Sequence, residues 1–205
     1  EPKGFVLYEG KSLYKESEND IVVILQTGNS ANKKTGNMMQ VWIMLKDIDP
    51  VEANKLGLDN AICGICTLRG IANNDPERKE AINRTCYVNF QTVKTIYRSY
   101  KKGNYPKIDP VDASKMIKYN KIWCNRGLRF GAYGDPALIP THVTNGLRSH
   151  LPKSMGITAY SHQANYKHAN IDPCFMLSCE TLDQAKTQWD QGNRTARTIK
   201  SVDEL

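Results

Sequence analysis

Hydrophobic residues in the first quarter of the chain gather in short runs that polar segments separate. β-Branched and aromatic residues cluster at 4–8, 21–26 and 38–45, and Gly, Ser, Asn or Asp bounds each run. Such runs are typical of β-strands. The polar segment 27–36 has the composition of a loop. We therefore predict an antiparallel arrangement of strands at the N-terminal end.

Helical patterns follow in the middle of the chain. Asp49 and Pro50 favour a short helix through Leu56, because Asp caps a helix and Pro loses no hydrogen bond in its first turn. Between 90 and 102, apolar residues recur at intervals of three and four, which indicates a helix with one buried face. A weaker pattern predicts a second helix at 112–119.

Strands and helices alternate in the C-terminal half. Strands are predicted at 128–133, 156–160, 174–179 and 194–199, with helices at 140–151 and 182–191. This alternation is typical of βαβ crossovers and parallel sheets. We expect a single α/β domain over 1–205, with a partial, TIM-like parallel sheet in the C-terminal half and an antiparallel N-terminal portion. Its longest apolar runs are far shorter than the roughly 20 residues that span a membrane, so we expect a soluble protein with no membrane partner.

Three cysteines in a predicted loop at about 61–90 suggest a metal site. Cys63 and Cys66 form a CxxC motif around a glycine that lets the backbone turn amide N–H groups toward thiolates, and Cys86 follows a polar loop. Unrelated cysteines and a redox dithiol explain this spacing less well. A single CxxC followed by isolated cysteines is more common around iron–sulfur clusters than in zinc fingers. We predict a cluster, with [4Fe–4S] favoured and zinc as the alternative.

The fourth ligand of such a centre is less directly indicated. Cys174 begins a predicted strand and is our choice, while Cys124 is the alternative. Cys179 lies further along the same strand, so we expect it to be buried in the core. If no fourth cysteine binds, one iron would be open to a small molecule.

Polar residues follow three of the predicted parallel strands. Asp135, His162 and Glu180 stand where the strands end, and ligand groups in parallel sheets gather at the carboxyl ends. We expect them to face one crevice. As an alternative, Asp135 accepts local backbone hydrogen bonds before Pro136, and His162 is a structural residue.

The net charge of +7 favours phosphate-rich partners. Arg98, Lys101, Lys102 and Lys107 alternate with tyrosines that could stack on bases, which makes them candidate nucleic-acid contacts. The alternative is a solvated helix end with its tyrosines packed inward.

Several motifs together carry a resemblance to a known family. They are Cys63-Gly-Ile-Cys66-Thr-Leu-Arg69, Arg84-Thr-Cys86, a tyrosine-rich segment at 96–106, and Arg129-Phe-Gly-Ala-Tyr-Gly-Asp-Pro136. Over about 28–198 the chain resembles an uncharacterised protein family encoded mainly by bacteriophages. The resemblance implies expression in the cytoplasm of an infected bacterial host and no particular activity.

The chain is also distantly similar to the half-barrel of radical S-adenosylmethionine proteins, although their CxxxCxxC spacing differs from the CxxC…C found here. Three functional hypotheses follow. The cluster is structural or redox-sensing, and the basic surface binds nucleic acid or a host protein. Alternatively, an open iron serves a radical-type enzyme that acts on a small substrate. In the third hypothesis, zinc stabilises a nucleic-acid-binding protein.

Overall fold

The N-terminal strands form an antiparallel meander, as predicted. The computed structural model describes residues 2–28 and 35–197, so part of the predicted loop at 27–36 lies outside the described residues. Strands β1 (Gly4–Lys11), β2 (Asp20–Gln26) and β3 (Met39–Leu45) pair in order, with Ile21 opposite Leu45 and Ile24 opposite Trp42. All of β3 and the centre of β2 are buried, which places these two strands at the middle of the core.

Two later strands extend this sheet in parallel. Strand β4 (Leu128–Tyr133) pairs with β3, and β5 (Ile157–Thr158) pairs with β4, giving the order β1-β2-β3-β4-β5. The long connection from β3 to β4 contains four α-helices, α1 (Pro50–Lys55), α2 (Asn60–Cys63), α3 (Phe90–Lys101) and α4 (Pro110–Tyr119). The sequence patterns predicted α1, α3 and α4, but not the four-residue α2 that leads into the CxxC motif.

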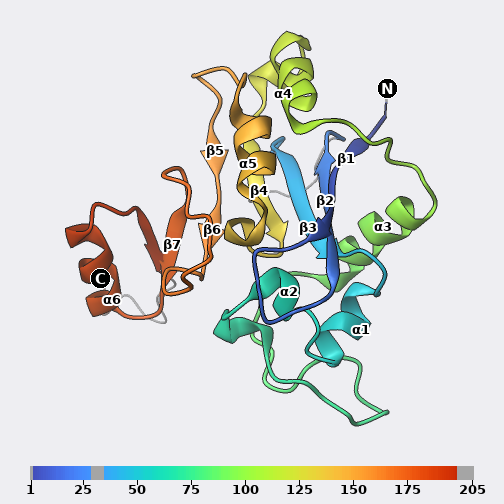
Figure 1. Ribbon diagram of the computed structural model, residues 1–205, viewed down its shortest axis with the longest axis vertical. Coiled ribbons are helices and arrows are strands. Elements are labelled where there is room, and N and C mark those ends of the chain that lie inside the picture. Colours follow the sequence, from blue (N-terminus) through green and yellow to red (C-terminus); the bar gives the residue numbers. More distant parts are fainter. Residues whose placement is uncertain (1, 29–34, 198–205) are drawn as a thin grey trace.

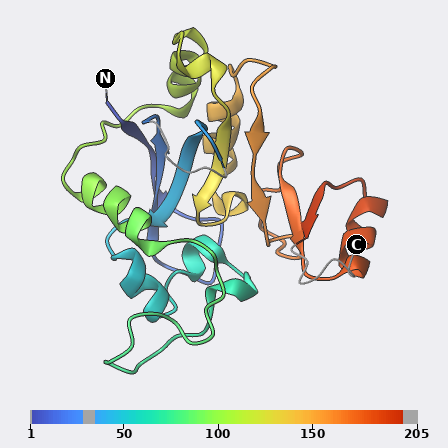
Figure 2. The ribbon, with the colours of Figure 1, turned by 180° about the vertical axis from the view of Figure 1, so that it is seen from behind.

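Helices cover both faces of the five-stranded sheet. Helix α5 (Thr141–Arg148), which connects β4 to β5, lies over the face seen in Figure 1, and α4 packs beside it. Helix α3 crosses the opposite face, which Figure 2 shows. Its buried residues Phe90, Val93 and Ile96 recur at the predicted helical spacing.

A second, smaller sheet contains the last strands of the described residues. Strands β6 (Tyr160–Ser161), β7 (Met176–Cys179) and β8 (Thr195–Arg197) are parallel, and α6 (Leu182–Asp190) connects β7 to β8. The prediction of one strand at 156–160 is therefore wrong. The chain leaves the first sheet after Thr158 and enters the second at Tyr160, with Ala159 buried between them. Both pieces are extended, so periodicity alone could not separate them.

The fold class is confirmed: an antiparallel N-terminal portion is joined to parallel β/α units. Some boundaries differ from the predictions, since α5 ends at Arg148 and β7 begins at Met176 rather than at Cys174. The predicted last strand is observed as β8, and its positions 198–199 lie outside the described residues. Among the described residues, no helix is both long enough and apolar enough to cross a membrane.

Candidate metal centre

The CxxC motif forms a tight turn at the end of α2. The N–H of Gly64 donates to the carbonyl of Asn60 at 2.7 Å, and the N–H of Cys66 donates back to the carbonyl of Cys63 at 3.0 Å. Gly64 has φ of +53°, a conformation that costs glycine little and other residues more. Cys66 then precedes the 3₁₀ helix η1 (Thr67–Arg69). The expected glycine turn is thus present, and it brings both cysteines to one side of a short loop.

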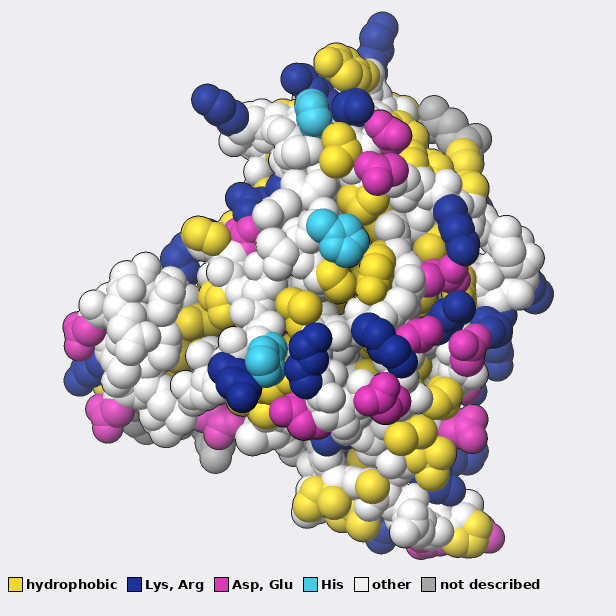
Figure 3. All heavy atoms as spheres, in the orientation of Figure 1, with side chains coloured by type: hydrophobic (Ala, Val, Ile, Leu, Met, Phe, Trp, Pro, Cys, Tyr) yellow, Lys and Arg dark blue, Asp and Glu magenta, His cyan; other side chains and the backbone are white. Residues whose placement is uncertain are grey.

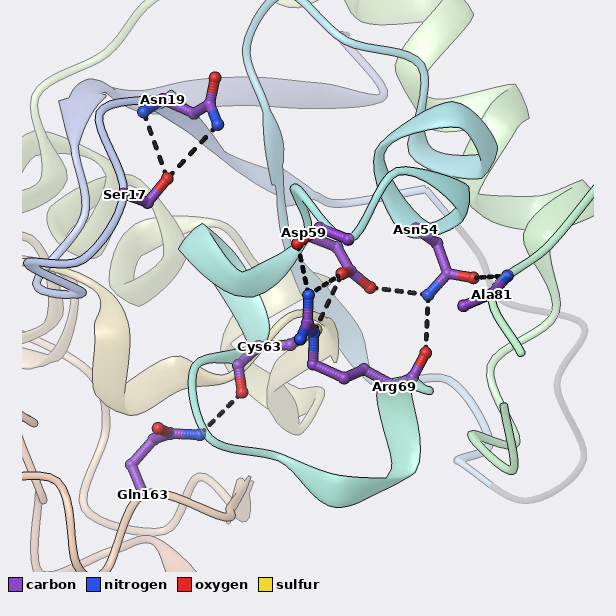
Figure 4. A network of polar contacts seen from close by, with 9 residues as sticks. Ser17, Asn19, Asn54, Asp59, Cys63, Arg69, Ala81 and Gln163 are labelled. Atoms are coloured by element: carbon purple, nitrogen blue, oxygen red, sulfur yellow. Dashed lines mark hydrogen bonds and ion pairs between the residues drawn. The ribbon is translucent and has the colours of Figure 1, made fainter. Parts of the chain in front are cut away.

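Gln163, which follows β6, holds this turn in place. Its Nε2 donates to the carbonyl of Cys63 at 2.9 Å and to Asp135 Oδ2 at 3.1 Å, while its Oε1 accepts from the N–H of Ile65 at 3.2 Å (Figure 4). The side chain is fully buried. Sequence analysis did not identify Gln163. Its only signal was its position directly after His162 at a strand end.

A charged network fixes the other side of the loop (Figure 4). The buried Asp59 carboxylate accepts from Arg69 Nη2 and from Asn54 Nδ2, both at 2.7 Å. Asn54 also donates to the carbonyl of Arg69 at 2.9 Å and accepts from the N–H of Ala81 at 3.1 Å. Burial raises the pKa of Asp59 although Arg69 opposes the shift. Through these contacts α1, η1 and the polar segment before Cys86 are joined.

The polar segment between Cys66 and Cys86 is ordered by its own hydrogen bonds. Ile71 and Ile82 exchange backbone hydrogen bonds of 2.9 and 2.8 Å, and the N–H of Asn73 donates to the carbonyl of Lys55 at 2.7 Å. The N–H of Cys86 then donates to the carbonyl of Leu68 at 2.9 Å, which places Cys86 beside η1.

The three cysteines Cys63, Cys66 and Cys86 lie close enough for their charges to interact. Burial raises the pKa of the Cys63 thiol well above its usual value, and the charges of Asp59, Cys66 and Cys86 raise it further. Burial also raises the pKa of Cys66 to about 11, although the backbone N–H groups of Leu68 and Arg69 favour its thiolate. All six cysteines are free thiols. At neutral pH Cys63 and Cys66 are therefore protonated, and a metal must displace those protons to bind.

Tyr133 brings an unpaired polar atom to the same place. Its ring is buried at the end of β4, and Phe90 packs edge-on against it with 5.9 Å between ring centroids. Among the described residues its hydroxyl oxygen has no hydrogen-bond partner. Burial raises the pKa of Tyr133, and the charges of Cys63, Asp59 and Cys86 raise it further. The hydroxyl is thus a buried, unpaired polar atom on which the charges of the loop act.

The remaining cysteines lie in other environments. Cys174 precedes β7, where burial and a hydrogen bond with Asp172 raise its pKa to about 12. Cys179 is buried at the end of β7, as expected. Cys124 lies in the 3₁₀ helix η2 (Trp123–Asn125), not at a strand start, and its Sγ approaches the carbonyl of Lys121 at 3.8 Å. The largest interactions that shift the pKa values of Cys63 and Cys66 come from other residues.

The strand ends also meet at the cysteine loop. The N–H of Asp135 donates a hydrogen bond of 2.6 Å to the carbonyl of Ile62. Its carboxylate accepts two more, at Oδ1 from the N–H of Ala137 at 3.0 Å and at Oδ2 from the N–H of His162 at 2.8 Å. Glu180 accepts a hydrogen bond from Thr67, the residue after Cys66.

The contacts of Asp135 are those of the turn alternative, because backbone N–H groups occupy both carboxylate oxygens. Burial raises its pKa, although these N–H donors oppose the shift. Two surface cavities, of about 220 and 260 Å³, are lined by other residues and do not include these strand ends. The ends of β4, β6 and β7 therefore lie at the cysteine loop. The Asp135 carboxylate makes structural hydrogen bonds there and is not free.

The basic segment around the end of α3 is partly neutralised. Lys101 Nζ lies 3.1 Å from Asp47, and Lys107 pairs with Glu9. Tyr97 is buried and the hydroxyl of Tyr100 donates to Glu9, so these rings pack inward as in the alternative interpretation. Arg98 and Lys102 are exposed. On the face seen in Figure 3, Lys and Arg side chains are interspersed with Asp and Glu. Nucleic-acid binding stays a prediction.

The arrangement as a whole gathers thiols without completing a ligand set. Within the described ranges, no three His, Cys, Asp or Glu side chains are positioned to hold one metal ion. Binding would therefore draw the three sulfurs inward from their present positions. Comparison with known proteins identifies no relative, since no protein-family model, curated protein or solved structure matches this chain.

Proposed function

We propose that this chain is a metal-binding protein in which Cys63, Cys66 and Cys86 hold an iron–sulfur cluster, with zinc as the alternative occupant. The observation that supports it is that Cys63, Cys66 and Cys86, three free and half-buried thiols from two separate chain segments, lie close enough for their charges to interact. Thiolates are the ligands that both zinc and iron–sulfur clusters use.

Two guanidinium groups lie in the surroundings of the thiols. Burial and the charge of Asp59 raise the pKa of Cys63, the charge of Arg69 opposes part of that rise, and Arg84 lies over the Phe90 ring at 4.2 Å, next to Tyr133. A thiolate-bound cluster carries net negative charge, so these guanidinium groups would offset part of it. We assign the cluster a structural or redox-sensing role, because contacts from Gln163 and Asp59 hold the loop that would carry it. A reducing bacterial cytoplasm, which the resemblance to phage proteins implies, would keep the thiols free.

One observation favours a second candidate, an enzyme with an open iron. The largest interactions of the Cys174 thiol are with Asp172 and Arg148, so a cluster bound at the loop by Cys63, Cys66 and Cys86 alone would have one iron without a cysteine ligand. Such an iron could bind a small molecule. Against it, both carboxylate oxygens of Asp135 are occupied by N–H donors, which leaves no free base at that strand end.

Metal and sulfide analysis of the protein purified without oxygen tests the proposal. We expect a brown protein with iron and acid-labile sulfide, because thiolate-bound clusters absorb visible light and zinc does not. Colourless protein with zinc would select the alternative occupant, and protein without metal, even after reconstitution, would refute the proposal.

Serine variants then identify the ligands. Cys63→Ser, Cys66→Ser and Cys86→Ser should each lose the metal, whereas the matched controls Cys124→Ser and Cys179→Ser should keep it. Cys174→Ser separates the two candidate functions. Loss of the cluster in that variant would make Cys174 the fourth ligand, and full retention would favour the open iron.

A further inference from the structure

We infer that the turn at the end of α4 binds single-stranded nucleic acid, with its lysines on the phosphates and Tyr119 stacked on a base. The surface consists of Lys118, Tyr119, Lys121, Ile122 and Lys153, and we call it the α4 corner. Helices α4 and α2 lie at opposite ends of the five-stranded sheet (Figure 1), so this surface is separate from the cysteine loop. It also differs from the basic segment at the end of α3.

The excess positive charge of the chain is concentrated in the segment that contains this corner. Residues 113–171 include eight Lys or Arg and a single acidic residue, Asp135. Their net charge therefore equals the +7 of the whole chain, and the rest of the sequence is neutral on balance. Asp135 is buried, so this segment exposes cations and no carboxylate. Such a surface attracts polyanions.

Three lysines of the corner keep their charge unpaired. Lys118, Lys121 and Lys153 are exposed, and none of them forms an ion pair with another described residue. By contrast, Lys115 and Arg148 each pair with an aspartate. The helix dipole accounts for Lys118 at the end of α4, but not for Lys121 and Lys153, which lie beyond the helix. Figure 3 shows Lys and Arg side chains beside hydrophobic ones at the top of the molecule, over α4.

The turn after α4 is ordered and presents two large apolar side chains. Asn120 Oδ1 accepts from the N–H groups of Ile122 and Trp123 at 2.9 and 3.0 Å, and Trp123 is buried in the core. Tyr119 is 74% exposed and Ile122 63%. The Lys118 ammonium lies over the Tyr119 ring at 5.5 Å, which places a cation beside an aromatic face. Because the backbone is already ordered, binding costs less conformational entropy.

A polar cavity of about 260 Å³ adjoins the corner. Asn125 and Ser154 are among the residues that line it. Asn125 Nδ2 donates to the carbonyl of Lys121 at 3.1 Å, so the cavity begins directly beside the turn. The N–H of His150 donates to Ser114 Oγ at 2.9 Å, which fixes the segment before Ser154 against α4. Amide and hydroxyl side chains of this kind hydrogen-bond to phosphates and base edges.

The chemistry of the corner favours single-stranded nucleic acid over other anionic partners. Lysines neutralise phosphates, and exposed aromatic rings stack on bases that a duplex would keep inside its own stack. An anionic membrane would favour a wider apolar face, whereas the corner presents Tyr119 and Ile122. An acidic protein offers no base for Tyr119. The alternation of cations with an exposed ring therefore fits a single strand best.

The test measures binding of a fluorescein-labelled oligothymidine of about 16 nucleotides to the full-length chain by fluorescence anisotropy, at about 50 mM salt. Tyr119→Ala should weaken binding about 5- to 100-fold, because a stacked base is lost. The double variant Lys118→Ala with Lys121→Ala should also bind more weakly. Its slope of log affinity against log salt should be smaller by about 1.4, because each phosphate contact of a single strand contributes about 0.7.

Matched controls change the same residue types elsewhere. Tyr87 is 70% exposed and follows Cys86, so Tyr87→Ala should bind like wild type. The double variant Lys101→Ala with Lys102→Ala removes two charges at the end of α3 and should keep the salt dependence of wild type. Melting curves of the corner variants should stay close to that of wild type, because the substituted side chains are exposed.

Each outcome supports or overturns the inference. Weaker binding in both corner variants, with both controls unchanged, supports it. Absence of binding at low salt, or unchanged affinity in either corner variant, overturns it. A larger loss in the α3 double variant would place the site there instead. Tighter binding to duplex DNA of the same length, to phosphatidylserine vesicles or to polyglutamate would also contradict the single-strand assignment. All measurements use metal-free protein, so the proposed metal site is tested separately.

Discussion

Replacing Gln163 with alanine tests whether the loop after β6 holds the CxxC turn. The change removes three hydrogen bonds, to the carbonyl of Cys63, to Asp135 Oδ2 and from the N–H of Ile65. Two of the partners keep another contact, because the Cys63 carbonyl still accepts from Cys66 and Asp135 Oδ2 still accepts from the N–H of His162. The N–H of Ile65 loses its partner.

The size of the effect follows from these contacts. A hydrogen bond to a charged group contributes about 1.5–3 kcal/mol and a neutral one about 0.5–1.5 kcal/mol. Ile65 is 44% exposed, so water can replace part of what its N–H loses. We therefore expect Gln163→Ala to lower the free energy of unfolding by about 3 kcal/mol. For a chain of this size, that corresponds to a melting temperature lower by about 6–12 °C.

Urea denaturation followed by circular dichroism, on metal-free protein, measures the change. Gln91→Ala is the control, because Gln91 is exposed on α3, and it should stay within about 0.5 kcal/mol of wild type. A Gln163→Ala protein that unfolds at the same urea concentration as the control would show that the turn does not depend on Gln163.

Three other predictions concern the surroundings of the site and the edge strand β1. Arg69→Met should lower the free energy of unfolding by about 3–5 kcal/mol, because it leaves the buried Asp59 carboxylate without its cation. The control Arg78→Met, at an exposed ion pair, should cost little. Equal effects of the two variants in denaturation would contradict this prediction. Glu9→Gln should cost about 1 kcal/mol at pH 7, and the cost should disappear in acid. Burial raises the pKa of Glu9, but hydrogen bonds, led by the one from Lys107, outweigh burial and hold this pKa below its usual 4.5. The Glu9 carboxylate therefore contributes its full stability above pH 4.5, and this contribution is lost as the pH falls through the lowered pKa. Removing metal from loaded protein with a chelator should lower its melting temperature, and an unchanged value would argue against a stabilising centre.

The elements that the sequence predicted well are those with strong local signals. Strands β2 and β3 are continuous apolar runs, and α1 has Asp49 as its cap and Pro50 at its first position. The split at Ala159 could not be foreseen, because both neighbouring strands are short and extended, and only their partners, β4 and β7, place them in different sheets. Pairing between distant segments leaves no local pattern.

The site was predictable only in part for the same reason. The CxxC spacing brings Cys63 and Cys66 together by itself, since a short turn leaves few other arrangements. Whether Cys174 joins them depends on the packing of the second sheet, and there the residue meets Asp172 instead. Tyr133 was visible in the sequence as part of an apolar strand, where a tyrosine normally signals packing. Its unpaired hydroxyl could be recognised only once its neighbours were known.

The contact between Gly64 and Gln163 has a consequence for how the sequence can vary. A Cβ atom at Gly64 would lie 2.2 Å from Gln163 Oε1, far inside van der Waals contact. An alanine at position 64 therefore requires the Gln163 side chain to move or shorten, so the two positions constrain each other although one follows α2 and the other follows β6. In a library that varies both, the double variant Gly64→Ala with Gln163→Ala should be less destabilised than the sum of its single variants. Relatives of this chain should accordingly change the two positions together, and a glutamine at 163 should be accompanied by a glycine at 64.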